Sequence, residues 1–94
     1  MGNPEIYILC TFSDSGRYVD SADTNRAGME ARAARIVEAA AADGWALDHL
    51  LEIPDAEQLE PVTPGVPYVC AVYHLRHPRR GWRNVELYRV PAND

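Results

Sequence analysis

The chain has 94 residues, of which 47% are hydrophobic and 24% are charged, and its formal net charge is −5 at pH 7. This length predicts a single domain over residues 1–94, with frayed ends at 1–4 and 91–94. No apolar run approaches the roughly 18 residues that span a bilayer. The start of the chain also lacks the basic and apolar segments of a secretory signal, so we expect a cytoplasmic protein without a membrane segment.

The charge is unevenly placed, and all nine basic residues are Arg. Residues 1–60 hold four Arg against twelve Asp and Glu, a balance of −8, whereas residues 61–94 hold five Arg against two acidic residues, a balance of +3. Affinity for nucleic acids depends mainly on neutralising phosphates, so this acidic chain is not expected to bind them. Cys10 and Cys70 lie in apolar segments, either as buried thiols in a reducing compartment or as a disulfide between neighbouring strands.

The first predicted element is a strand over about 5–12, in which both faces are apolar. Such a strand is typical of the inside of a sheet that is covered on both sides. We expect a helix to cover one face and a partner subunit to cover the other. Residues 13–21 are polar, with Gly16 as a turn residue, and predict a connection rather than a strand.

A helix pattern follows and runs to about Asp43. Its apolar positions, spaced i, i+4, i+7, i+8 and i+11, are Met29, Ala33, Ile36, Val37 and Ala40. Ser21, Asp23 or Thr24 is expected to cap its start, and Arg26 with Glu30 forms an i, i+4 pair. Gly44 is placed to end the helix in a left-handed conformation, after which Trp45 packs back over the helix end.

Three further strands are predicted over about 45–53, 68–76 and 82–90, and the last two form a hairpin. In the first of them, alternation places Trp45, Leu47, His49, Leu51 and Ile53 on one face. The proline-rich segment 54–67 between strands is longer than a usual loop. The order is β-α-β-β-β, and the crossover helix favours parallel pairing of the first two strands. We therefore expect an α+β fold, with a four-stranded mixed sheet and one long helix on one face.

The step from the helix through Gly44 and Trp45 to Leu47 resembles small uncharacterised bacterial domains with a β-α-β-β order. The resemblance covers about residues 5–76; residues 82–90 lie beyond it, and the proline-rich segment is longer here. The family has no known catalytic residues, so the resemblance implies a fold and no active-site residue.

The strongest charge feature is the predicted hairpin turn. Its candidate binding residues are Arg76, His77, Arg79, Arg80, Trp82 and Arg83. Guanidinium groups beside an indole are suited to a phosphate, a carboxylate or an acidic protein surface. The alternative is a solvated turn whose charges discourage edge-to-edge association.

His74 and His77 have the spacing H-x-x-H, but residues three apart on a strand point to opposite faces and do not chelate one ion. No Cys pair and no H-E-x-x-H helix accompanies them, so we expect no metal site. The sequence also contains no glycine-rich phosphate fingerprint, and we expect no cofactor. His49, His74 and Tyr73 are candidates for the few polar groups of an apolar pocket between two sheets.

Three functions remain open from the sequence. The first is a non-enzymatic binding module that recognises a protein or a small anionic ligand through the Arg/Trp turn. It would form a homodimer through the sheet face away from the helix or through an edge strand. The second is a small cofactor-independent enzyme or small-molecule binder, and the third is a small acidic inhibitor of the phage type. The absence of an assembled catalytic motif favours the first.

Overall fold

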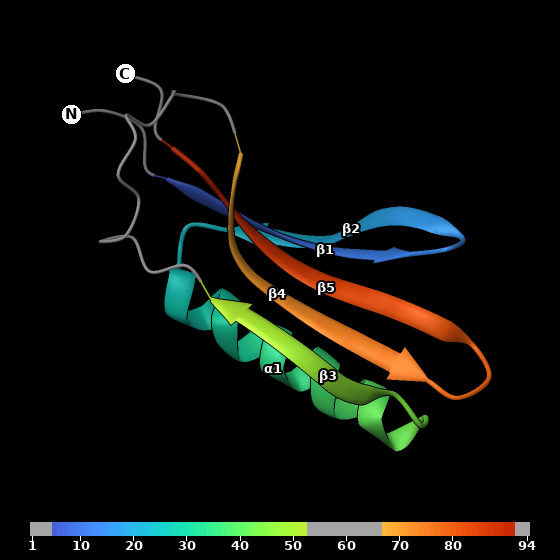
Figure 1. Cartoon of the computed structure of the whole chain (residues 1–94). Helices are drawn as coiled ribbons and strands as arrows, with labels where there is room; N and C mark the ends of the chain where they lie inside the picture. Colours follow the sequence, from blue (N-terminus) through green and yellow to red (C-terminus); the bar gives the residue numbers. More distant parts are fainter. Residues whose placement is uncertain (1–4, 53–66, 92–94) are drawn as a thin grey trace.

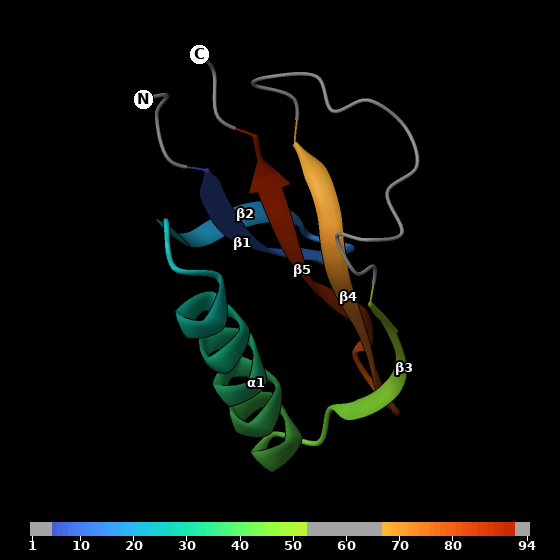
Figure 2. The same ribbon diagram turned by 90° about the vertical axis from the view of Figure 1, so that its left-hand side faces the viewer.

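The structure is a computed structural model that describes residues 5–52 and 67–91. Its elements are β1 (Ile6–Ser13), β2 (Gly16–Asp23), α1 (Arg26–Ala42), β3 (Ala46–Glu52), β4 (Tyr68–His77) and β5 (Gly81–Val90). The strands form one sheet in the order β2-β1-β5-β4-β3, and every neighbouring pair is antiparallel. The fold is α+β, as predicted, with α1 on one side of the sheet (Figures 1 and 2).

The prediction of four strands in a mixed sheet is wrong. Residues 16–23, expected as a connection, form β2, which pairs with β1 across a two-residue turn of Asp14 and Ser15. This hairpin reverses the chain before the helix begins, so β1 and β3 run in opposite directions. The helix instead connects β2 and β3, which run the same way at opposite edges of the sheet. The proline-rich segment 54–67 lies outside the described residues, apart from Pro67.

The helix is formed as its pattern predicts. Met29, Ala33 and Ala40 are buried against the sheet, and Ile36 and Val37 pack partly against the same core. The opposing sheet residues include four that are fully buried: Leu9, Leu75, Val85 and Leu87. Burying this apolar area is the main source of stability in a domain of this size.

The two helix ends differ in how well they were predicted. The N-cap is Asn25, not Ser21, Asp23 or Thr24, and its side chain accepts the N–H of Gly28 at 3.0 Å. At the other end Gly44 has φ +96°, as expected. The N–H groups of Gly44 and Trp45 reach back to Ala41 and Ala40 at 3.1 Å each, which is the Schellman pattern of helix termination.

One register shift changes which residues share a face. Leu47 pairs with Leu75 on the helix side, whereas His49 pairs with His74 on the side away from the helix. The register shifts between Leu47 and His49, so the strict alternation predicted for this strand is wrong. We call the side of the sheet that carries His74 the open face.

Candidate functional site

The predicted binding cluster lies around the β4–β5 turn, but the strands divide it between two faces. Arg76 and Trp82 are cross-strand partners on the open face, whereas Arg83 pairs with Leu75 on the helix side. Arg79 and Arg80 lie in the turn itself, which closes at Gly81 with φ +90°. The six predicted residues therefore do not form one surface.

His77 has both ring nitrogens engaged within the protein. Its Nδ1 accepts the backbone N–H groups of Arg79 at 3.0 Å and Arg80 at 3.1 Å. An Nδ1 that accepts leaves the proton on Nε2, which donates to the carbonyl oxygen of Asp43 at 3.1 Å. The ring also lies 5.1 Å from that of Trp45. His77 thus connects the turn to the end of α1.

Arg76 is engaged in a different way. Its Nε lies 3.3 Å from a carboxylate oxygen of Asp48, and both side chains are more than half exposed. An ion pair this exposed contributes little to stability and is screened by salt. It does, however, partly neutralise Arg76 as a candidate for an external anion.

Arg80 and Arg83 reach a hollow between the two hairpin turns. Because β1 pairs with β5, Ser13 lies opposite Arg83, and the β1–β2 turn comes next to the β4–β5 turn at one end of the sheet (Figure 1). We call this space of about 240 Å³ the hairpin-end hollow; its lining residues are Ser13, Asp14, Ser15, Trp45, Arg80, Trp82 and Arg83.

The wall of the hairpin-end hollow contains two unsatisfied donors. The guanidinium carbon of Arg83 lies 4.3 Å from the ring centroid of Trp45. The Nε of Arg83 and the indole Nε1 of Trp45 are buried, and neither has a hydrogen-bond partner. Buried N–H groups without an acceptor are unfavourable, and an anion bound beside them offers acceptor atoms. The hollow is lined by two guanidinium groups, those of Arg80 and Arg83, and by one carboxylate, that of Asp14.

A second polar cluster crosses the open face. His74 Nδ1 lies 2.5 Å from Asn84 Oδ1, Asn84 Nδ2 donates to Glu86 at 3.2 Å, and the Tyr88 hydroxyl donates to Glu86 at 2.5 Å. Burial, followed by this hydrogen bond to Glu86, raises the pKa of Tyr88 to about 12. His74 donates to Asn84, and Asn84 and Tyr88 both donate to the Glu86 carboxylate, so the four side chains hold one another in place.

A pocket of about 180 Å³ adjoins this chain, lined by Ile8, Cys10, Arg17, Val19, Pro67 and Tyr88. Burial raises the pKa of the Cys10 thiol, which keeps it protonated and unsuited to act as a nucleophile. Cys10 and Cys70 are both free, and their strands are separated by β5, so the disulfide alternative is not realised.

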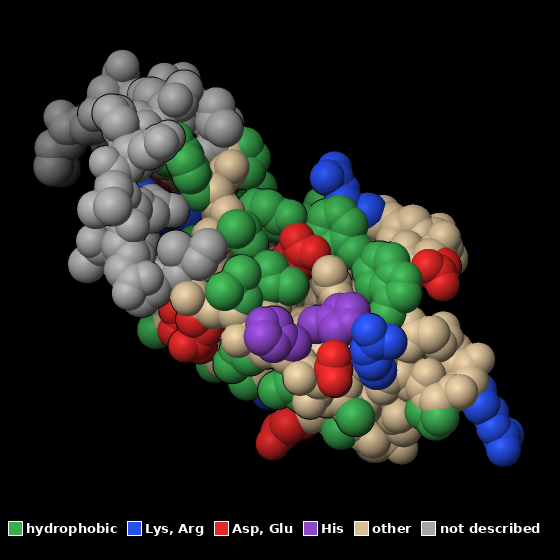
Figure 3. Space-filling model, viewed as in Figure 1, with side chains coloured by type: hydrophobic (Ala, Val, Ile, Leu, Met, Phe, Trp, Pro, Cys, Tyr) green, Lys and Arg blue, Asp and Glu red, His purple; other side chains and the backbone are tan. Residues whose placement is uncertain are grey.

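The three residues of the alternative pocket do not come together. His49 and His74 are neighbours on the open face, and Figure 3 shows two histidine side chains side by side there, with hydrophobic and charged groups around them. Tyr73 pairs with Val85 and packs against the core on the helix side, where burial raises its pKa. A site that uses both histidines therefore excludes Tyr73.

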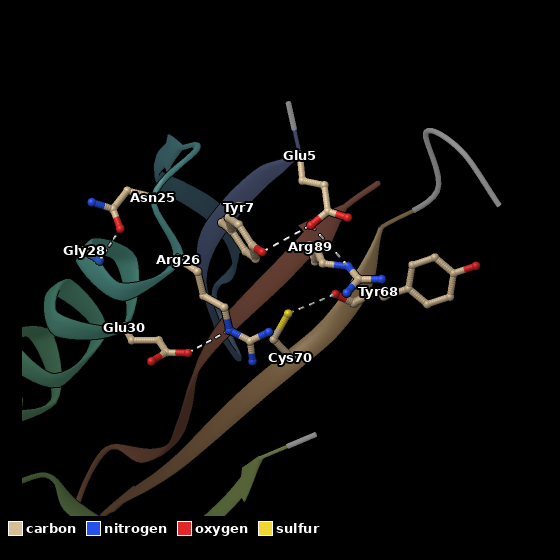
Figure 4. A network of polar contacts seen from close by, with 9 residues as sticks. All are labelled: Glu5, Tyr7, Asn25, Arg26, Gly28, Glu30, Tyr68, Cys70 and Arg89. Carbon is tan, nitrogen blue, oxygen red and sulfur yellow. Dashed lines mark hydrogen bonds and ion pairs between the residues drawn. The ribbon is translucent and has the colours of Figure 1, made fainter. Parts of the chain in front are cut away.

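Another polar network lies at the opposite end of the sheet from the hollow, on the helix side (Figure 4). Arg89 is 8% exposed and approaches Glu5 at 3.9 Å, and the hydroxyl of Tyr7 donates to the same carboxylate at 3.2 Å. The predicted Arg26–Glu30 pair is confirmed at 2.8 Å. The guanidinium carbon of Arg26 lies 6.0 Å from the ring centroid of Tyr7, so the helix start and the strand ends are connected here.

Residues 5–52 and 67–91 contain no group of three or more His, Cys, Asp or Glu side chains placed to hold a metal ion. The one helix within these ranges is neither long nor apolar enough to cross a membrane.

Comparison with known proteins found no matching family model, curated protein or solved structure. The resemblance to small bacterial domains therefore stays a prediction. The class that the fold defines is a small α+β protein, with a helix on one side of an antiparallel sheet.

Four residues of the hairpin-end hollow were not among the predicted site residues: Ser13, Asp14, Ser15 and Trp45. The sequence contained one signal for the first three, because Gly16 follows Asp14 and Ser15 as it does in a tight hairpin turn. That signal was outweighed by the polar, non-alternating residues of β2. Trp45 was expected as a packing residue, and only its contact with Arg83 brings it to the site.

Proposed function

We propose that the protein is a small, non-enzymatic cytoplasmic binding module that holds an anionic group in the hairpin-end hollow. The observation that carries the proposal is that Arg80 and Arg83 reach one hollow, while neither forms an ion pair with another described residue. A guanidinium is suited to a carboxylate or phosphate because its planar fork donates two parallel hydrogen bonds. The anion belongs either to a small ligand or to an acidic segment of a protein partner.

The neighbouring aromatic residues support this proposal. Trp45 and Trp82 line the same hollow and are the only two tryptophans of the chain. Arg and Trp are enriched among residues that dominate binding energy, since they combine charge-assisted hydrogen bonds with a large contact area. The cytoplasmic assignment is supported by two buried cysteines that remain free.

The test uses tryptophan emission of the purified chain, titrated separately with inorganic phosphate and with a peptide of consecutive glutamates. Arg80→Gln and Arg83→Gln should each weaken binding by about tenfold or more, because a hydrogen bond to a charged group contributes roughly 1.5–3 kcal/mol. Raising the salt concentration should weaken binding in the unchanged protein. Tighter binding of phosphate would identify a small anion as the ligand, and tighter binding of the glutamate peptide would identify an acidic segment of a protein partner.

Arg79→Gln is the matched control, because Arg79 lies in the same turn and loses the same charge but does not line the hollow. Its affinity for both probes should equal that of the unchanged protein. If all three variants bind alike, net charge and not the hollow determines binding, and the proposal fails. The absence of any emission change with either probe would also contradict it.

We also propose that the protein forms a homodimer through the edge strand β3. All seven residues of β3 are exposed, including Leu47 at 47%, Leu50 at 42% and Leu51 at 46%. An exposed apolar edge strand carries unpaired backbone groups and is a surface on which a second strand can pair. Light scattering should give twice the chain mass.

The test of the homodimer compares charged substitutions on the two edge strands. Leu50→Glu on β3 should give a monomer. Val19→Glu is the matched control, because Val19 is 58% exposed on the other edge strand, β2. Dimers that persist in Leu50→Glu, or a monomeric unchanged protein, would contradict this interface.

A further inference from the structure

The two histidines on the open face lie directly opposite each other. His49 on β3 is the register partner of His74 on β4, because the register shift at Asp48 turns His49 toward the open face. Directly opposite residues of antiparallel strands have Cβ atoms roughly 4.5–5.5 Å apart. Two imidazoles at this separation can place one nitrogen each on a shared ion, and Figure 3 shows two histidine side chains side by side.

The hydrogen bonds of His74 prepare its outer nitrogen for coordination. The contact between His74 Nδ1 and Asn84 Oδ1 is 2.5 Å, and an amide oxygen only accepts, so Nδ1 carries the proton. The Nε2 of the neutral ring then has a free lone pair. Asn84 is fixed in this orientation because its Nδ2 donates to Glu86.

This arrangement is the one that metal-binding histidines use. Such a histidine usually donates its second ring nitrogen to an oxygen acceptor, which sets the tautomer and the ring orientation. Here Asn84 is the acceptor, and Glu86 and Tyr88 hold it in turn. In contrast to His74, His49 is exposed and forms no hydrogen bond with another described residue, so its ring is free to turn toward a shared ion.

We propose that His49 and His74 chelate one divalent transition-metal ion of the Zn²⁺, Ni²⁺ or Cu²⁺ class. Imidazole nitrogen suits these ions, whereas Mg²⁺ and Ca²⁺ prefer oxygen ligands. No third His, Cys, Asp or Glu within residues 5–52 and 67–91 completes the group, so water fills the remaining positions. The spacing first considered, His74 with His77, is not used, since His77 packs against Trp45 on the helix side.

The test is calorimetric titration of the full chain, without an affinity tag, with Zn²⁺ and with Ni²⁺. One ion per chain should bind. His49→Ala and His74→Ala should each weaken binding by about tenfold or more, a loss of about 1.4 kcal/mol for each factor of ten. Asn84→Ala should weaken it by about tenfold without removing a ligand, as substitutions of supporting residues do. Mg²⁺ should not compete.

A second measurement follows the ion through Trp82, whose ring centroid lies 6.3 Å from that of His74 in a stacked orientation. Bound Cu²⁺ should quench its emission, and Trp82→Phe should remove most of this quenching. The control is Glu38→Gln, which removes an exposed carboxylate of α1 and should bind ions like the unchanged protein.

The proposal is overturned if folded His49→Ala binds Zn²⁺ and Ni²⁺ as tightly as the unchanged protein, or if the unchanged protein binds neither at millimolar concentration. His49→Ala decides the matter even where His74→Ala fails to fold, since His49 is exposed. The metal site does not depend on the proposed function: Arg83→Gln and the monomeric Leu50→Glu should both keep full ion affinity.

Discussion

The guanidinium of Arg83 lies over the indole of Trp45, with its central carbon 4.3 Å from the ring centroid. Trp45 is 4% exposed and lies between the end of α1 and the start of β3, whereas Arg83 lies near the start of β5, the return strand of the β4–β5 hairpin. The contact therefore connects two elements that are distant in sequence, and it forms one wall of the hairpin-end hollow.

This contact should contribute measurably to stability. Arg83→Gln should lower the free energy of unfolding by about 0.5–2 kcal/mol, the range for a cation held over an aromatic ring. Urea denaturation followed by circular dichroism measures the change. Arg79→Gln, in the exposed turn, should leave the midpoint within error. Equal midpoints for the two variants would show that Arg83 is only a surface charge.

Gly44, which follows the end of the helix, should tolerate a side chain less well than Gly28 within the helix. Its φ of +96° disfavours any side chain, and an added Cβ would lie 3.0 Å from Nε2 of His77. Gly44→Ala should lower stability by about 1–2 kcal/mol or more, the cost of a left-handed conformation for an L-residue. Denaturant unfolding measures the loss.

Gly28→Ala is the control for this substitution. Gly28 lies within the helix without positive φ, and its added Cβ would meet Asn25 at an ordinary 3.4 Å. Helix propensity then favours Ala by roughly 0.5–1 kcal/mol, so this variant should be as stable as the unchanged protein or more stable. If Gly44→Ala matched it, the helix end would tolerate a side chain.

Asp20 and Arg32 connect the edge strand β2 to the helix, with Nε of Arg32 2.8 Å from the carboxylate. The hydrogen bond from Arg32 lowers the pKa of Asp20. A carboxyl group with a lowered pKa stabilises the folded state above its usual pKa, and this stabilisation is lost as the pH falls through the folded value.

The strength of this pair is measured by a double-mutant cycle of Asp20→Asn and Arg32→Gln. Because both side chains are partly exposed, the coupling should be only about 0.2–1 kcal/mol near neutral pH. It should decrease at high salt and vanish in acid. A coupling independent of both conditions would mean that the two residues interact through packing instead.

The hydroxyl of Tyr88 should lose its proton only at high pH. Its raised pKa of about 12, against an ordinary value near 10, means that the unfolded chain loses this proton first. Stability should therefore be unaffected by Tyr88 below about pH 10 and fall as the pH rises toward about 12. Glu86→Gln removes the carboxylate that accepts the hydroxyl and should lower the pKa of Tyr88, leaving the part that burial causes.

Ultraviolet absorbance of the phenolate follows this titration. The chain has five tyrosines, and the Tyr88→Phe variant identifies the step of the titration at the highest pH as that of Tyr88. That step should disappear in Tyr88→Phe and shift to lower pH in Glu86→Gln. An unchanged titration curve in Glu86→Gln would show that the carboxylate does not act on the hydroxyl.

The helix and the β4–β5 hairpin were predictable because their signals are local. The apolar spacing from Met29 to Ala40, the position of Gly44 and the turn before Gly81 each depend on a few neighbouring residues. β2 was not predicted, because no local signal marks these residues as a strand. Its residues are polar and mostly exposed, so only pairing with β1 makes them a strand.

The candidate site was predicted in part. Arg80, Trp82 and Arg83 do line one hollow, because they are close in sequence at one hairpin. The opposite wall, with Ser13 and Asp14, comes from the β1–β2 turn, and local patterns do not tell which strands pair across a sheet.

The sequence by itself determined the α+β class, the helix and where it ends, since amphipathic spacing and glycine conformation act within a few residues. Only the tertiary structure decided that Trp45 meets Arg83 and that His49 faces His74. The first contact depends on how the strands pair. The second also depends on the one-residue register shift between Leu47 and His49, which moves a side chain from one face of the sheet to the other.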